Sequence, residues 1–220
     1  MKLELEPSSP FDLGLTLCCG QAFRWDKMGE WWYGVVGDRI VKIRQEGKEL
    51  EFEGVDKSFA ASYFRLADDL NRILSVIGKD KYICITIDKN KGLRILRQEP
   101  WECLISYICA TYKNIASIRR MLLALSKKFG QMTHFQETNF YTFPTPDKLA
   151  RASVKELAEC ELGYRAKYVS QTARMVYDGE FDLENLKRLP YKKAKEALLE
   201  LPGVGQKVAD CVLLFSLDKL

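Results

Sequence analysis

The strand-forming and helix-forming stretches of this chain are separated along the sequence, and this order limits the folds that it can adopt. Runs of aromatic and β-branched residues, divided by short turn signals, occupy residues 21–53 and predict a small antiparallel sheet. From residue 56 onward the apolar spacing becomes helical, and everything after about residue 97 is predicted to be helical. We leave residues 80–96 open, because their alternating isoleucines fit a short strand and a helix equally well. A sheet followed by helices predicts an α+β fold with two segregated parts.

The helical part can be divided further by its caps and breakers. Pro100 suits a first helical position, and the nearly continuous apolar run after it predicts a helix that is buried on most sides. Asn114 is a candidate cap for the next helix, which Gly130 would close. The aromatic residues between 135 and 143 are interpreted as packing for a long connection. The predicted helices cover residues 101–112, 115–129, 147–151, 154–161, 164–178 and 191–200.

The stretch Leu201 to Cys211, near the end of the sequence, reads as a helix, a tight turn and a second helix. Pro202 cannot continue a helix, and Gly203 and Gly205 permit backbone angles and close approaches that a Cβ atom would forbid. Backbone N–H groups at the start of a helix are unpaired, converge, and carry the positive end of the helix dipole. The turn therefore predicts a binding site for a phosphate group. Lys207 falls in the first turn of the second helix.

Length and composition exclude several classes of protein. With 220 residues and 47% hydrophobic content, the chain can bury a real core. It has no stretch long and apolar enough for a membrane span, and its charged start is no signal peptide, so we expect an intracellular soluble protein, in a prokaryotic cytoplasm or a nucleus, with no membrane partner. The seven cysteines are scattered and never spaced C-x-x-C, so we expect reduced thiols, no metal site and no cofactor. Residues 91–131 carry eight Lys and Arg against two acids, which could line a phosphate-facing surface.

Four ordered motifs carry a resemblance to a known family. They are Cys18-Cys19-Gly20-Gln21-Ala22-Phe23-Arg24-Trp25, then Leu96 to Leu104 (LRQEPWECL), then Leu162 to Ser170 (LGYRAKYVS), and finally the hairpin itself, Leu201 to Cys211 (LPGVGQKVADC). Together they resemble the 8-oxoguanine DNA glycosylase/lyase family of the helix-hairpin-helix DNA glycosylases. The resemblance implies an antiparallel-sheet amino-terminal domain over residues 1–97 and a helical glycosylase domain over residues 98–220.

The resemblance also implies a function and the residues that carry the chemistry. It implies a base-excision repair enzyme that flips 8-oxoguanine out of duplex DNA, removes it, and cleaves the strand through a Schiff base. Lys207 would be the nucleophile, and Cys211, one helical turn later, would pack against the flipped base. The carbonyl of Gly20 would accept the N7 proton that 8-oxoguanine has and guanine lacks. No cofactor is implied.

Other residues would hold the duplex. By the same resemblance, the amides of Gly203, Gly205 and Val208 would bind backbone phosphates without reading sequence. Tyr164 and Arg165 would fill the gap left by the flipped base and touch the estranged base. Asn114 belongs to the run that the family uses on DNA. The expected partner is double-stranded DNA containing oxidised guanine, bound by a monomer.

Two departures from the family pattern bear on activity. Ser117 stands where the family has an Arg that reads the opposite cytosine, so we expect weak discrimination for cytosine. The family's catalytic Asp lies on a segment after the hairpin helix that residues up to 220 do not include, so we expect this sequence to be part of a longer product whose carboxy-terminal part is missing here. The alternatives are a non-catalytic duplex-binding module that uses the hairpin alone and a related glycosylase with another lesion preference.

Overall fold

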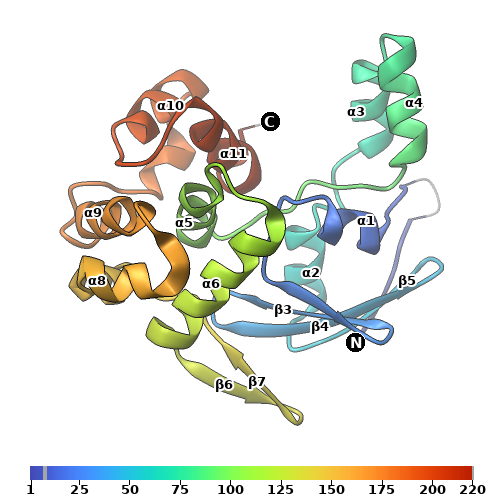
Figure 1. Cartoon of the computed structure of the whole chain (residues 1–220). Helices are drawn as coiled ribbons and strands as arrows, with labels where there is room; N and C mark the ends of the chain where they lie inside the picture. The colour runs from blue at the N-terminus through green and yellow to red at the C-terminus, as the bar shows by residue number, and fades with distance from the viewer. Residues whose placement is uncertain (7–8, 220) are drawn as a thin grey trace. The chain divides into compact units, whose positions relative to one another are not determined.

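The structure is a computed structural model that describes residues 1–6 and 9–219, and it consists of two compact units. Unit 1 contains residues 1–34 and 39–97, and unit 2 contains residues 35–38 and 98–220. Unit 1 carries an antiparallel sheet and short helices, whereas most of unit 2 is helical (Figure 1). The predicted α+β fold class is therefore confirmed.

The sheet of unit 1 has five strands in the order β1-β5-β4-β3-β2. Its strands are β1 (Lys2–Glu4), β2 (Trp25–Met28), β3 (Trp31–Val36), β4 (Arg39–Glu46) and β5 (Glu49–Glu53). Trp25 pairs with Gly34 across the antiparallel β2 and β3. Its indole lies so close to Gly34 that a Cβ there would come within 2.5 Å of the ring. The glycine therefore makes room for the buried tryptophan, whose Nε1 donates to the Tyr63 hydroxyl at 3.0 Å.

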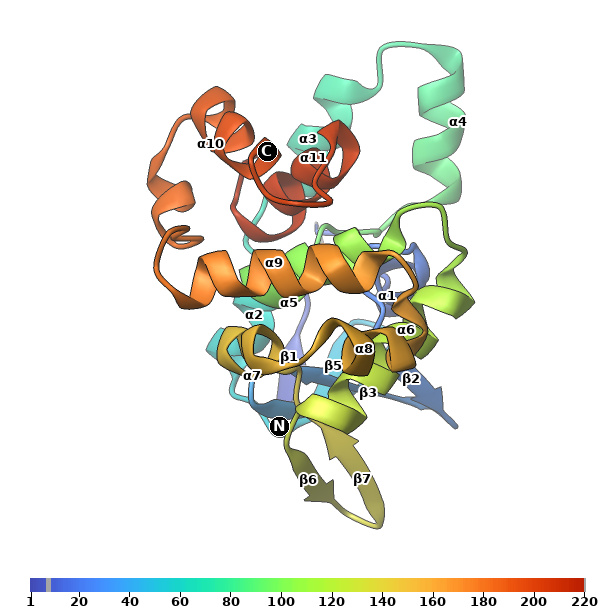
Figure 2. The same ribbon diagram turned by 60° about the vertical axis from the view of Figure 1, so that its left-hand side comes forward.

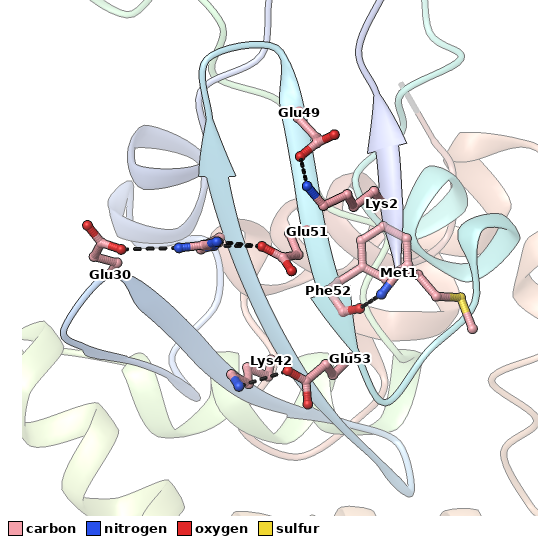
Figure 3. A network of polar contacts seen from close by, with 9 residues as sticks. Met1, Lys2, Glu30, Lys42, Glu49, Glu51, Phe52 and Glu53 are labelled. Atoms are coloured by element: carbon pink, nitrogen blue, oxygen red, sulfur yellow. Dashed lines mark hydrogen bonds and ion pairs between the residues drawn. The ribbon is translucent and has the colours of Figure 1, made fainter.

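Polar contacts along the sheet fix the register of its edge strand (Figure 3). The amino-terminal ammonium group donates to the Phe52 carbonyl at 2.5 Å, and Lys2 pairs with Glu49 at 2.6 Å. Lys42 pairs with Glu53 at 2.8 Å on the neighbouring strand. The exposed Lys2–Glu49 pair stabilises by only about 0–1 kcal/mol. Strand β1 was not predicted, because it is three residues long and its partner strand lies far away in sequence.

The helices of unit 1 begin at aspartate caps. They are α1 (Leu13–Cys18), α2 (Lys57–Tyr63), α3 (Leu70–Ile77) and α4 (Lys81–Lys89). Helix α4 resolves the ambiguity over residues 80–96, because the Asp80 side chain accepts hydrogen bonds from the N–H groups of Tyr82 and Ile83 at 2.8 and 2.9 Å. This cap supplies a helix start that periodicity alone did not reveal. Helix α1, which Asp12 caps, was not predicted.

Unit 2 is built from helices around α5. These are α5 (Pro100–Ala110), α6 (Ile115–Phe129), α7 (Pro146–Arg151), α8 (Val154–Leu157), α9 (Arg165–Tyr177), α10 (Tyr191–Leu199) and α11 (Gln206–Ser216), with a 3-10 turn at Asn185–Arg188. Four residues of α5 are fully buried: Cys103, Leu104, Ile105 and Cys109. This burial confirms a helix that is covered on most sides. Helix α9 runs beside α5 and α7 (Figure 2).

Two parts of unit 2 differ from the sequence prediction. A β-hairpin, β6 (Met132–Phe135) and β7 (Thr138–Tyr141), lies where we expected only a long connection. Its turn uses Gln136 at φ 53° instead of a glycine or an asparagine, so the usual hairpin signal is missing. The helix expected over residues 154–161 ends as α8 at Leu157 and continues as a π-helical turn, in which Glu161 has a φ of 63°. None of the helices built by the described residues has the length and apolarity that crossing a bilayer requires.

Candidate active site and nucleic-acid interface

Helix α9 packs against the turn between α10 and α11 and holds it in place. Gly203 has a φ of 81°, and a Cβ at this position would lie 2.8–2.9 Å from atoms of the Tyr168 side chain. The Thr172 hydroxyl donates to the Pro202 carbonyl at 3.1 Å. The N–H of Val204 donates to the Leu201 carbonyl at 3.1 Å and closes the turn. Gly203 is therefore required by the fold itself, because it combines left-handed backbone with a close contact.

The second glycine of the turn has a different role. Gly205 is the N-cap of α11 with φ −99° and ψ −178°, an extended conformation that any residue can adopt. It is exposed, and a Cβ on it would meet no atom of the described chain within 4 Å. Of the two properties that we named for these glycines, Gly205 therefore does not use special backbone angles, and the close approach of another molecule to its backbone stays a prediction. The protein leaves the space beside Gly205 open.

The amides around this open space have no partners within the described residues. The N–H groups of Gly203, Gly205 and Val208 make no hydrogen bond there, and α11 has no side-chain cap at its start. Unpaired amides at the first turn of an eleven-residue helix carry partial positive charge. The amides of Gly205 and Val208 thus belong to the start of α11, and that of Gly203 to the turn before it.

Lys207 lies in the first turn of α11, as predicted. Its side chain is exposed, and it makes no hydrogen bond or ion pair with any residue that the structure describes. Nothing within the described chain covers this turn, so the side chain is open to solvent.

Cys211 follows Lys207 by one helical turn and is half-buried. Partial burial raises the pKa of the Cys211 thiol, and the Lys207 cation acts in the opposite direction. The two side chains therefore interact on one face of α11. Their proximity is the arrangement that the i,i+4 spacing predicts.

A polar clamp that we did not predict as a site fixes α11 against α10. Asp210 accepts a hydrogen bond from the Tyr191 hydroxyl at 2.5 Å and from Lys195 at 2.9 Å. The hydrogen bond from Lys195 has the largest effect in lowering the pKa of the Asp210 carboxyl, and the bond from Tyr191 lowers it further. On the opposite side of α11, the rings of Tyr107 and Phe215 stack with centroids 5.7 Å apart, which ties the helix to α5. The helix that carries Lys207 is thus held on two sides.

The two residues predicted to enter the DNA lie at the start of α9, and the structure separates their roles. Tyr164 is 56% exposed, and the Arg165 guanidinium lies over its ring at 4.4 Å. Arg165 itself is only 3% exposed and donates to the carbonyls of Thr111 and Leu162. In this conformation its guanidinium is bound to backbone and is not free to stack on a base. The predicted contact of Arg165 with an estranged base stays a prediction.

The loop between α5 and α6 presents another exposed aromatic ring. Tyr112 is 94% exposed and has a φ of 53°, which is unfavourable for a bulky side chain. The Arg165 bond to the preceding Thr111 carbonyl holds this loop in place. Asn114, a predicted DNA contact, caps α6 by accepting from the Ser117 N–H at 2.9 Å. The cap is as predicted, and it commits the side-chain oxygen of Asn114.

Gly20 belongs to unit 1, where its φ is 86°. The neighbouring Gln21 is 3% exposed, and its amide nitrogen donates to the carbonyls of Thr16 and Arg94 at 2.9 and 2.8 Å. Its side-chain oxygen accepts from the Leu96 N–H at 2.8 Å. A buried amide with three bonds holds the backbone on which Gly20 sits. Sequence reasoning missed this role for Gln21, although a glutamine within the motif was visible.

Metal chemistry has no candidate ligands in the part of the chain that the structure describes. No three His, Cys, Asp or Glu side chains come together there in a way that could hold an ion. Burial raises the pKa of the Cys109 thiol to about 12, as expected for a packed rather than a reactive cysteine.

Comparison with family models covers nearly the whole chain in two consecutive pieces. Residues 3–104 match the amino-terminal domain of 8-oxoguanine DNA glycosylase. Residues 105–211 match the HhH-GPD superfamily of base excision DNA repair proteins. The second match ends at Cys211, the last residue of the hairpin motif.

Individual relatives agree with the family models. The N-glycosylase/DNA lyase OGG1 of Arabidopsis thaliana is 36% identical over 222 residues, which are 94% of this chain and 61% of the relative. The apo structure of Clostridium acetobutylicum 8-oxoguanine glycosylase/lyase superposes with a TM-score of 0.91 at 33% identity, over 95% of this chain and 75% of that one.

The same bacterial protein in complex with double-stranded DNA containing cytosine opposite 8-oxoguanine gives a TM-score of 0.93 at 31% identity, over 100% of this chain and 79% of that one. The chain spans about three fifths of the length of the curated relatives that it matches, 61% and 62% for the plant and yeast proteins. The fold is shared with the bacterial protein. The chain belongs to the 8-oxoguanine DNA glycosylase/lyase family.

Proposed function

We propose that this chain binds duplex DNA, flips out and removes 8-oxoguanine, and cleaves the strand at the resulting site through a Schiff base on Lys207. The observation that carries the proposal is an unpaired lysine in the first turn of α11, next to a set of unpaired amides at the same helix end. Relatives with this fold are named N-glycosylase/DNA lyase, which supports both the base-removal and the lyase step.

Strand anchoring is the first role of the hairpin. The N–H groups of Gly203, Gly205 and Val208 donate to phosphate oxygens, and the open space beside Gly205 lets the phosphate approach the backbone. These contacts carry no sequence information. They place the sugar of the damaged nucleotide near α11, where Lys207 can reach it.

Base flipping costs a few kcal/mol, and exposed side chains supply part of the compensation. Tyr164 offers an exposed ring that can stack in the gap left by the base. The ring rests on the guanidinium of Arg165, which acts as its support instead of as a DNA contact. Selection of the lesion falls to the Gly20 carbonyl, whose bond to the N7 proton discriminates by about 1–3 kcal/mol when buried.

The chemical step begins when the neutral Lys207 amine attacks C1′ of the sugar. The glycosidic bond breaks, and its electron pair leaves with the base, which takes up a proton. Nitrogen then loses one proton, the C1′–O4′ bond breaks with its electron pair going to O4′, and O4′ takes up a proton, which leaves a protonated Schiff base between C1′ and Lys207. Removal of a C2′ proton then drives β-elimination, in which the C3′–O bond breaks and the 3′ phosphate leaves. The duplex excludes water from the exposed Lys207 side chain as it covers this turn.

Borohydride trapping tests the proposal directly. An 8-oxoguanine duplex should yield a covalent adduct with the chain, and the adduct should be lost in Lys207→Gln. Lys167→Gln is the matched control, because Lys167 is also an exposed lysine near the start of a helix. An undamaged duplex should give no adduct with any of the three proteins.

The same samples separate the enzyme from the binding module. Fluorescence anisotropy should show salt-dependent duplex binding. Lys207→Gln should change the affinity by less than about threefold, because it removes only one of the positive charges near the DNA phosphates. Binding without an adduct in a protein that also carries the segment after residue 220 would refute the enzymatic proposal and support a duplex-binding module, because the catalytic Asp that the resemblance implies is not among residues 1–220. Loss of binding in Lys207→Gln would show that the lysine holds the strand instead of attacking the sugar.

A further inference from the structure

The backbone that carries Gly20 follows helix α1 directly, within unit 1. Cys19 is the C-cap of the helix, and Gly20 comes next with a φ of 86°. A glycine has no Cβ to restrict its ψ angle, and ψ decides where its carbonyl points. No residue in the described part of the chain donates a hydrogen bond to this carbonyl. Local sterics therefore leave the direction of the Gly20 carbonyl open, and a neighbouring group has to fix it.

The residue after Gly20 is anchored by its side chain. The Gly20 carbonyl belongs to the planar peptide unit that ends at the Cα atom of Gln21, so the placement of Gln21 sets the direction of the carbonyl. Gln21 is buried, and its Nε2 donates to the carbonyls of Thr16 and Arg94 at 2.9 and 2.8 Å. Its Oε1 accepts from the Leu96 N–H at 2.8 Å. The carboxamide therefore uses both of its donors and one acceptor.

The contacts with residues 94–96 resemble the pairing of two parallel strands. In a parallel ladder, one residue bonds the C=O and the N–H of two residues that flank its partner. The Gln21 carboxamide bonds the Arg94 C=O and the Leu96 N–H in the same way, in place of a backbone peptide. Only a carboxamide can do this, because a carboxylate has no donor. An asparagine would be one methylene group too short to occupy the same place.

The segment that Gln21 bonds is itself fixed. The Arg94 N–H donates to the Thr16 hydroxyl at 3.1 Å. The Arg94 guanidinium is buried and donates to the carbonyls of Arg65 and Asp68 at 2.6 and 3.1 Å. Thr16 is fully buried in α1. Gln21 therefore ties the backbone after α1 to two rigid neighbours, the helix end and residues 94–96.

We propose that Gln21 is a positioning residue for lesion selection, whose carboxamide holds the Gly20 carbonyl in the direction of the N7 proton of 8-oxoguanine. The inference rests on the proposed role of Gly20. A hydrogen bond weakens steeply when donor and acceptor are misaligned. A carbonyl that could turn away would accept less well from the lesion and would also repel guanine less. Gln21 thus acts on discrimination between the two bases and leaves binding of the DNA backbone unchanged.

A second glutamine of unit 1 supplies a matched control. Gln45 donates from Nε2 to the carbonyls of Phe11 and Gly47 at 2.9 and 3.0 Å, and its Oε1 accepts from the Leu13 N–H at 2.8 Å. Gln45 therefore holds the start of α1 with as many bonds as Gln21 makes at its end. Gln21→Met and Gln45→Met each remove three bonds at nearly constant side-chain length. Urea unfolding should show that both variants are less stable than the unaltered protein.

Duplex binding measures lesion selection. Anisotropy is recorded on a protein that also carries the segment after residue 220 and has Lys207→Gln, so that the lesion stays intact. The three duplexes contain 8-oxoguanine, guanine or a tetrahydrofuran abasic analogue opposite cytosine. The ratio of the guanine Kd to the 8-oxoguanine Kd should fall at least about fivefold in Gln21→Met and less than about twofold in Gln45→Met. Affinity for the abasic analogue, which has no base to read, should stay within about twofold in both variants.

Two further measurements keep the test decisive. Gln21→Glu has the same shape and keeps an acceptor for the Leu96 N–H, but its carboxylate cannot donate, so its preference for 8-oxoguanine should also fall at least about fivefold. Hydrogen exchange by NMR needs no DNA. The backbone amides of residues 20–22 should exchange faster in Gln21→Met than in Gln45→Met.

The outcomes separate this inference from the proposed function. Full preference for 8-oxoguanine in the folded Gln21 variants would overturn the inference and leave the proposed function intact. An equal loss of preference in Gln45→Met, or unchanged exchange of residues 20–22 in Gln21→Met, would reduce Gln21 to a general stabilising residue. Equal binding of the 8-oxoguanine and guanine duplexes by the protein with both glutamines in place would instead refute the proposed role of Gly20, and the inference with it.

Discussion

Alanine substitution at the two glycines of the hairpin turn should separate folding from DNA binding. At Gly203, alanine would hold a φ of 81°, which costs about 1–2 kcal/mol for a residue with a Cβ. The new methyl group would also lie 2.8–2.9 Å from the Tyr168 side chain, and such overpacking costs about 1–3 kcal/mol. The sum is about 2–5 kcal/mol. At Gly205 the backbone is extended and the space is open, so the fold should change by less than about 0.5 kcal/mol.

The effect on DNA should be reversed. A Cβ on Gly205 would occupy the space through which a phosphate reaches the amides, so Gly205→Ala should weaken duplex binding about tenfold or more at unchanged stability. Urea unfolding and fluorescence anisotropy on the same samples measure both quantities. The reasoning is refuted if Gly203→Ala is as stable as the unaltered chain, or if Gly205→Ala binds DNA with full affinity.

Three further predictions concern single side chains. Arg165→Ala should lower the free energy of unfolding by about 2–4 kcal/mol, because a buried charged donor to two carbonyls is lost. The control variant Lys167→Ala should change the free energy of unfolding by less than about 0.5 kcal/mol. If urea unfolding shows equal stability for the two variants, the main role of Arg165 is to contact DNA. Lys207→Gln removes the cation that opposes the raised pKa of Cys211, so the fraction of Cys211 present as thiolate near neutral pH should fall. Mass spectrometry should then show slower labelling of Cys211 by iodoacetamide. Faster labelling would contradict the proximity of the two side chains. Because Ser117 replaces the expected arginine, excision of 8-oxoguanine should differ by less than about threefold between opposite bases, and a strong preference for cytosine would show that another residue reads that base.

Much of the fold could be predicted because its signals are local. Helix α6 was placed over Ile115–Phe129 from its apolar spacing, an asparagine cap and a closing glycine, and the structure has these bounds. The strands between residues 25 and 53 followed from aromatic and β-branched runs. Strand β1 and the β6–β7 hairpin were missed, since one depends on a distant partner and the other on a left-handed glutamine. The local sequence pattern reveals neither the distant partner strand nor the left-handed backbone of the glutamine.

The site was harder to predict than the fold, because burial is a tertiary property. The sequence placed Arg165 next to an aromatic residue at a helix start, but only the structure shows the Thr111 and Leu162 carbonyls that bind it. Likewise, spacing placed Lys207 on the first turn of α11, yet it could not show that the side chain is exposed. The role of Gln21 was missed for the same reason, since its partners come from other elements, and a structural role for Asp210 could be inferred but not its partners Tyr191 and Lys195.

The contacts of Asp210 with Tyr191 and Lys195, which fix α11 against α10, bear on how the exposed Lys207 would act. A flexible, solvated amine would be a poor nucleophile if its helix could also move, because effective positioning requires the reacting groups to be held close. Asp210 fixes the helix to α10 through Lys195 and Tyr191, and Phe215 stacks on Tyr107 of α5. In the proposed function, this fixed helix sets the direction of attack in advance, and the arriving DNA covers the exposed Lys207 side chain, which couples the chemistry to substrate binding.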